Sequence, residues 1–175
     1  MSAKNIILIG FMGVGKGTFA RALAGASGLF AIDCDDMIES YANKKIRKIF
    51  EEQGEVEFRK IEKKLAKFLE KNVSGAIISS GGGFYAVKNL NKIGTVIYLK
   101  SSFDAIIKRI NSSQNASKKI AKRPLLADLK KARALHEQRD KKYSAKADYI
   151  VNVEKNSQKE VIEKLLKIIK KEVKK

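Results

Sequence analysis

The residues with the clearest chemistry lie between Gly10 and Thr18, directly after the apolar run Ile6–Ile9, and they read Gly-Phe-Met-Gly-Val-Gly-Lys-Gly-Thr. Glycines lack a Cβ atom, so the backbone can curl and direct successive N–H groups at one anion. A helix that begins near Lys16 adds the positive end of its dipole, and Lys16 supplies a charge for the β and γ phosphates of a nucleoside triphosphate. The spacing predicts a phosphate-binding loop that takes ATP or GTP.

A pair of carboxylates, Asp33 and Asp35, ends the second expected strand. In an extended segment, side chains two residues apart share one side, so both carboxylates could face the γ-phosphate and an acceptor hydroxyl. The alternative is a turn and helix cap, with Asp35 capping the helix that follows.

Three more features stand where an acceptor could bind. Arg59 follows Phe58 on a helix, so a guanidinium would lie beside an aromatic side chain. The triplet Gly81, Gly82, Gly83 follows the third expected strand and permits close approach of backbone to a ligand. Arg123 and Arg139 come later in the chain. Taken singly, the triplet could be an ordinary turn and the arginines could form surface ion pairs.

The apolar pattern alternates between short and long segments, which is typical of a parallel sheet covered by helices on both faces. We therefore expect a three-layer α/β fold. The expected strands are Asn5–Ile9, Leu29–Asp33, Ala76–Ser79, Thr95–Leu99 and Tyr149–Val153. The expected helices are Lys16–Ser27, Gly54–Lys71, Ser102–Asn111, Leu126–Lys146 and Gln158–Val173.

One polar segment, 111–122, lacks apolar periodicity and leads into Arg123-Pro124-Leu125-Leu126. Long segments of this kind inside a compact domain are usually functional. We interpret residues 111–125 as a lid; a disordered surface insertion is the alternative.

Composition limits the class of protein. The chain has 175 residues, 44% of them hydrophobic, with one proline and one cysteine. We expect a single domain over 1–175 in the reducing cytoplasm, with no signal peptide and no membrane segment. The net charge of +18 could indicate a basic nucleic-acid-binding module. However, the lysines lie on helical outer faces and are not interleaved with aromatics, so we expect no nucleic-acid partner.

Taken together, these motifs make the chain resemble the shikimate kinases over essentially its whole length. The glycine triplet and Arg-Pro-Leu-Leu are the specific part, because many families share the phosphate loop. The resemblance rests on Gly-Phe-Met-Gly-x-Gly-Lys, Asp33-x-Asp35, Phe58-Arg59, Gly81-Gly82-Gly83, Arg123-Pro124-Leu125-Leu126 and Arg139-x-x-x-Tyr143. It implies a P-loop kinase fold with sheet order 2-3-1-4-5 and a lid. It also implies transfer of the γ-phosphoryl of ATP to the 3-hydroxyl of shikimate in aromatic amino-acid biosynthesis, by a monomer.

The resemblance assigns a role to each site residue. The resemblance places a shikimate-binding region over about 33–62. Arg59 and Arg139 would clamp the substrate carboxylate, Asp35 would orient or deprotonate the hydroxyl, and Gly81, Gly82 and Gly83 would offer backbone N–H groups. Lys16 and Arg123 would stabilise the transferring phosphoryl. Arg109 would pack on adenine, and Asp33 would hold Mg²⁺ through water. The remaining nucleotide-binding positions would be Gly13, Val14, Gly15, Gly17 and Thr18.

Position 17 departs from the family pattern, which has Ser or Thr as a magnesium ligand where this chain has Gly17. Lys-Gly-Thr is the pattern of adenylate kinases, so a nucleoside monophosphate kinase is the rival enzyme; a gluconate kinase is a weaker one. Of the single residues, we expect His136 on a helix surface and Cys34 as a buried spacer.

Overall fold

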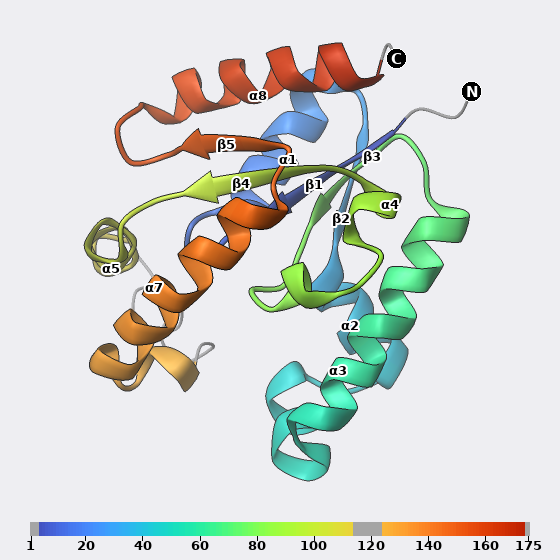
Figure 1. Cartoon of the computed structure of the whole chain (residues 1–175), viewed down its shortest axis with the longest axis vertical. Helices are drawn as coiled ribbons and strands as arrows, with labels where there is room; N and C mark the ends of the chain where they lie inside the picture. Colours follow the sequence, from blue (N-terminus) through green and yellow to red (C-terminus); the bar gives the residue numbers. More distant parts are fainter. Residues whose placement is uncertain (1–3, 114–123, 174–175) are drawn as a thin grey trace.

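The computed structural model describes residues 4–113 and 124–173, and at its centre lies a five-stranded sheet (Figure 1). The strand order is β2-β3-β1-β4-β5 and every pair is parallel, which confirms the expected architecture. The strands are β1 Asn5–Ile9, β2 Phe30–Asp33, β3 Ala76–Ser79, β4 Gly94–Lys100 and β5 Tyr149–Asn152.

Helices cover both faces of this sheet; in Figure 1, α8 lies on one side of it and α7 on the other. Helix α1 packs beside α8 and contacts β1, β2 and β3, whereas α4 and α7 contact β4. The helices are α1 Lys16–Ser27, α2 Cys34–Ala42, α3 Ile46–Asn72, α4 Leu90–Ile93, α5 Phe103–Asn111, α7 Leu129–Lys146 and α8 Gln158–Val173, with short 3₁₀ turns η1 Phe84–Ala86 and η2 Pro124–Leu126.

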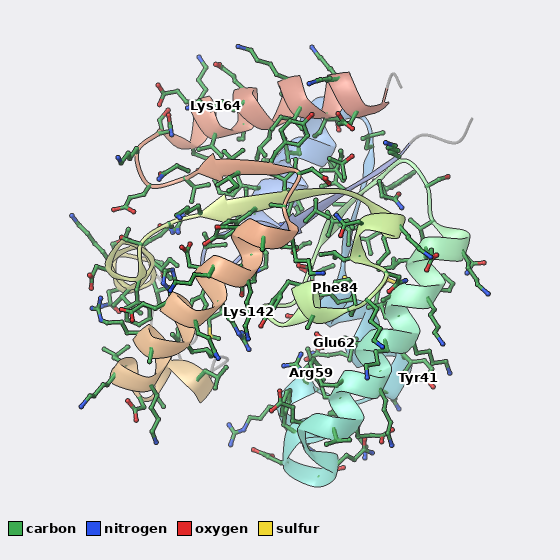
Figure 2. The ribbon with its side chains drawn as sticks, viewed as in Figure 1. Tyr41, Arg59, Glu62, Phe84, Lys142 and Lys164 are labelled. Atoms are coloured by element: carbon green, nitrogen blue, oxygen red, sulfur yellow. The ribbon has the colours of Figure 1, made fainter. Side chains whose placement is uncertain are left out.

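The lysine-rich helical faces point to solvent, as the sequence predicts. Lys164 on α8 extends away from the sheet (Figure 2) and donates a hydrogen bond to the side chain of Asn156. None of the helices in the described part of the chain is both long and apolar enough to cross a membrane.

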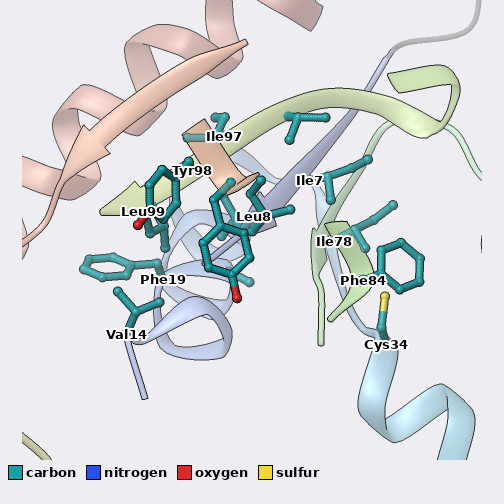
Figure 3. Close-up of a cluster of buried hydrophobic side chains, with 14 of the residues drawn as sticks. Ile7, Leu8, Val14, Phe19, Cys34, Ile78, Phe84, Ile97, Tyr98 and Leu99 are labelled. Atoms are coloured by element: carbon teal, nitrogen blue, oxygen red, sulfur yellow. The ribbon is translucent and has the colours of Figure 1, made fainter. Parts of the chain in front are cut away.

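The core lies between the sheet and its helices (Figure 3). All of β1 is buried, because a central parallel strand is covered on both faces. Cys34 is fully buried, as expected, and its thiol points toward the ring of Phe84 (Figure 3). Burial raises the pKa of this thiol, and the adjacent carboxylates raise it further.

The chain turns into helix α2 directly after β2, and this overturns one expectation. Asp33, not Asp35, is the N-cap: its Oδ1 accepts hydrogen bonds from the backbone N–H groups of Asp35 at 2.9 Å and Asp36 at 3.4 Å. Asp35 therefore lies in the first helical turn. The extended geometry that would point Asp33 and Asp35 the same way does not apply, because the chain is already helical at Cys34 and Asp35.

Helix α3 extends further toward the N-terminus than the sequence predicts. It starts at Ile46 instead of Gly54, although Gly54 itself is non-helical, with φ 77° and ψ 175°. A glycine adopts this backbone conformation without the steric cost of a Cβ atom. Gly54 is therefore a break between two helical segments, and the second segment matches the predicted helix.

Candidate active site

The phosphate-binding loop connects β1 to α1 at the carboxyl edge of the sheet, where open α/β folds bind ligands. Gly13 and Gly15 have φ values of 81° and 100°, which favour glycine. Gly13 also has no space for a side chain, because a Cβ atom there would lie 2.7 Å from Cδ1 of Ile110. Lys16 begins α1, and its Nζ donates to the carbonyl of Gly10 at 2.7 Å and of Phe11 at 3.1 Å. The loop and its lysine thus have the expected arrangement.

The position of the family's missing hydroxyl faces one carboxylate, one guanidinium and one hydroxyl group. A Cβ on Gly17 would lie 3.4 Å from Oδ2 of Asp33, 3.4 Å from Nη1 of Arg21 and 3.7 Å from Oγ of Ser79. Since Oδ1 of Asp33 bonds the start of α2, Oδ2 is the oxygen that faces position 17. A cation coordinated by Asp33 would therefore lie beside Gly17.

The other nucleotide-site predictions fall around the same loop. Val14 is buried in the core, so only its backbone is available to a phosphate, and Thr18 is exposed. Nη1 of Arg109, on α5, lies 3.8 Å from where a Cβ of Gly15 would be. Its Nε is buried without a hydrogen-bond partner among the described residues, and burial lowers the pKa of the guanidinium.

The glycine triplet forms a turn after β3 that is held from the side of α7. The carbonyl of Gly82 accepts hydrogen bonds from the hydroxyl of Tyr143 at 2.6 Å and from Nη1 of Arg139 at 3.2 Å. Both donors belong to α7, one turn apart. Tyr143 is buried, which raises its pKa, so it stays a donor throughout the neutral and mildly alkaline range.

Helix α3 reaches the opposite side of this turn through Arg59. A side chain at Gly83 would overlap the guanidinium of Arg59, so the glycine is needed for this approach. The Arg59 guanidinium also lies 5.2 Å from the ring centre of Phe58, as the sequence predicts. Figure 2 shows Arg59 and its neighbour Glu62 extending from α3 toward the turn. The turn thus brings Arg59 and Arg139 together from two helices.

Two carboxylates meet at the start of the turn. A Cβ on Gly81 would lie 2.8 Å from Oδ1 of Asp35 and 3.5 Å from Oε1 of Glu62. Asp35 is open to solvent on one side, but the protein around its carboxyl group raises its pKa, and the nearby Asp33 carboxylate raises it further. Burial also raises the pKa of Glu62, against the opposing effect of Arg59.

Two buried polar residues near the site were missed or misjudged from the sequence. Glu62, which accepts a hydrogen bond from Arg59, was missed, although its spacing of three residues is that of a helical ion pair. His136 was expected on the surface, and this is wrong. It is buried, its Nε2 lies 3.0 Å from the carbonyl oxygen of Ser101, and its ring packs edge-on against Phe11 and Phe103.

Residues 114–123 of the predicted lid 111–125 lie outside the described residues, and Arg123 is one of them. The remaining predicted residues gather at one edge of the sheet. Phosphate loop, carboxylates and paired arginines together form a site suited to transfer of a phosphoryl group to an anionic acceptor.

Comparison with known proteins agrees with this site. The shikimate kinase family model matches residues 12–170. A shikimate kinase of Helicobacter hepaticus is 39% identical over 170 residues, which cover 97% of this chain and 98% of the relative. The structure of a shikimate kinase from Acinetobacter baumannii in complex with shikimate has a TM-score of 0.83 and 29% identity, and covers 97% of this chain and 94% of that one.

A gluconokinase from Sinorhizobium meliloti has a TM-score of 0.60 at 14% identity, covering 98% of this chain and 94% of the other, which is a likeness of fold alone. The family match covers most of the chain and includes the phosphate loop from Met12 onward, the paired arginines and the glycine turn. This chain belongs to the shikimate kinase family.

Proposed function

We propose that the chain transfers the γ-phosphoryl group of ATP to the 3-hydroxyl of shikimate, yielding shikimate 3-phosphate, ADP and a proton. The observation that supports this most directly is the meeting of Arg59 and Arg139 at the Gly81–Gly83 turn. Two guanidinium groups from different helices suit a small acceptor with one carboxylate, since each can form charge-assisted hydrogen bonds to it.

In this proposal the carboxylate of Asp35 accepts a hydrogen bond from the acceptor hydroxyl. Its raised pKa brings the carboxylate closer to the range in which a general base accepts and releases a proton. Lys16 moves from the loop carbonyls onto the phosphates, and Arg123 joins it in stabilising the charge that develops on the transferring group. Arg109 packs on the nucleotide base, because its guanidinium lies beside Gly15 of the phosphate loop.

We further propose that Mg²⁺ acts with ATP. Magnesium in phosphoryl-transfer sites takes one or two carboxylates with phosphate and water oxygens, and it neutralises phosphate charge. The residues here fit such an ion: Oδ2 of Asp33 faces position 17 beside the loop, while Gly17 contributes no side-chain ligand. Asp33 would hold the ion's water shell, and the phosphates would supply direct ligands.

The proposal is tested by measuring ADP release from ATP and magnesium with shikimate, AMP, CMP, gluconate or water as acceptor. We expect shikimate to give the fastest turnover by a wide margin. Faster turnover with AMP or CMP would instead identify a nucleoside monophosphate kinase. The position of phosphate on the product is checked by ³¹P and ¹H NMR.

A further inference from the structure

Arg59 binds two carboxylates that differ sharply in exposure. Its Nε and Nη2 donate to Oε1 of Glu55 at 3.1 and 2.9 Å, while its Nη1 donates to Glu62. The Glu62 side chain is 3% exposed and the Glu55 side chain is 66% exposed. Glu62 is thus a fixed partner inside the protein, whereas Glu55 is held only from the solvent side.

The contact with Glu55 occupies an edge of the Arg59 guanidinium that is able to bind a carboxylate with two hydrogen bonds. The Nε–H and one Nη2–H lie parallel and form the fork that binds carboxylates in bidentate pairs. Glu55 places an oxygen at that fork. A second carboxylate cannot take the same two donors at full strength, so substrate and Glu55 compete for Arg59.

Glu55 can leave this position at little cost. It follows the non-helical Gly54 and so starts the second segment of α3. Within residues 4–113 and 124–173, Arg59 is its one ion-pair partner. Exposed ion pairs are weak, and a typical one corresponds to roughly a 1.5- to 5-fold preference for the paired state.

We propose that Glu55 is an exchangeable stand-in for the substrate carboxylate: it occupies the Arg59 fork in the empty site and is displaced when the acceptor binds. This inference rests on the proposed function, because it needs a carboxylate-bearing acceptor. The consequence is a determinant of acceptor affinity outside the reacting centre. Because Glu55 occupies the fork for most of the time, the apparent affinity for the acceptor falls in proportion to the fraction of Arg59 that is free. The expected decrease is about two- to sixfold.

The test compares Glu55→Gln with Glu57→Gln, a matched control in which the lost partner is Lys60 on the outer face of the same helix. Steady-state rates are measured against shikimate at saturating ATP. We expect Glu55→Gln to lower the KM for shikimate about two- to sixfold, with the change confined to KM and absent from kcat. The KM for ATP should stay at the parent value, and Glu57→Gln should match the parent in every constant.

A second arm uses shikimate methyl ester, which keeps the ring and hydroxyls but carries no carboxylate. Its dissociation constant, measured by calorimetry, should be the same for the parent and Glu55→Gln, because there is no anion to compete. A raised KM for shikimate would show that Glu55 orients Arg59, and an unchanged KM would show no competition; either overturns the proposal. Absence of shikimate-dependent turnover in the parent would overturn the proposed function instead.

Discussion

Replacing Tyr143 by Phe removes one hydroxyl from the support of the glycine turn and little else. The hydroxyl donates to the Gly82 carbonyl at 2.6 Å, and the ring packs at a tilt against Tyr98 and edge-on against Tyr85, with centroid distances of 5.1 and 5.0 Å. Phenylalanine preserves the ring contacts. The hydrogen bond is partly buried and joins two neutral groups, so its loss costs about 1 kcal/mol, within a range of roughly 0.5–1.5 kcal/mol.

That free energy sets the size of two expected effects. In a domain of this length, about 1 kcal/mol lowers Tm by roughly 2–4 °C. The Gly82 carbonyl also keeps Arg139 as its remaining donor, at 3.2 Å, which draws this guanidinium toward the turn and away from the acceptor. If the whole of the lost free energy reaches the acceptor site, the KM for shikimate rises about fivefold, with kcat changed less.

Differential scanning calorimetry and steady-state kinetics measure both effects. Tyr41→Phe is the control, because the Tyr41 hydroxyl is exposed and accepts a hydrogen bond only from Lys64 among the described residues. Its Tm and its KM for shikimate should match those of the parent. If Tyr143→Phe also melts with the parent and keeps its KM, then the Tyr143 hydroxyl does not hold the turn and our account of α7 is wrong.

Four further predictions concern the phosphate loop and its surroundings. Lys16→Ala should abolish ADP release while circular dichroism remains that of the parent; a folded variant with near-parental turnover would refute its role. Arg139→Ala should raise the KM for shikimate by tens to thousands of fold and spare that for ATP, since leaving a desolvated charge unpaired costs about 2–5 kcal/mol. Because the protein around the carboxyl group raises the pKa of Asp35, its ionisation disfavours the folded state, so Asp35→Asn should lower kcat strongly yet raise Tm at pH 7; that gain should shrink as the pH falls through the raised pKa of the folded state and vanish only well below about 3.9, where Asp35 is protonated in both the folded and the unfolded protein. The Cβ atom of Gly17→Ser fits without overlap, and the variant should lower the magnesium concentration for half-maximal rate, measured by titration at saturating ATP and shikimate; an unchanged midpoint would mean that residue 17 does not reach the metal.

The phosphate loop could be predicted from the sequence because its chemistry is local. A buried strand, three glycines and a lysine define it within a dozen residues, and β1 and α1 match their predicted bounds. The glycine turn and its two arginines were picked out from their residue types as candidates, but their joint role came only through resemblance, since nothing in their sequence spacing brings α3 and α7 to the same turn.

What the sequence did not predict depends on tertiary contacts. Helix α2 was missed as an element. The side chain of Asp33 caps its first turn, whereas we expected Asp33 and Asp35 to be part of one extended segment. His136 was misplaced because α7 carries weak apolar periodicity, and the contact that buries this ring comes from Phe11, far away in the sequence. Glu62 was not singled out from the sequence, because part of its surroundings comes from the turn after β3, which is distant in the sequence.

The burial of Cys34 makes the folded protein a natural background for site-specific labelling. It is the chain's single cysteine, it has no exposed surface, and its thiol is kept protonated by a raised pKa. Maleimides and disulfide reagents react with the exposed thiolate form, so the native protein should be almost inert to them. A cysteine introduced at an exposed position can then carry a fluorophore or spin label alone, without first removing a native thiol. Conversely, the rate at which Cys34 itself becomes modified reports how often the core between β2 and η1 opens.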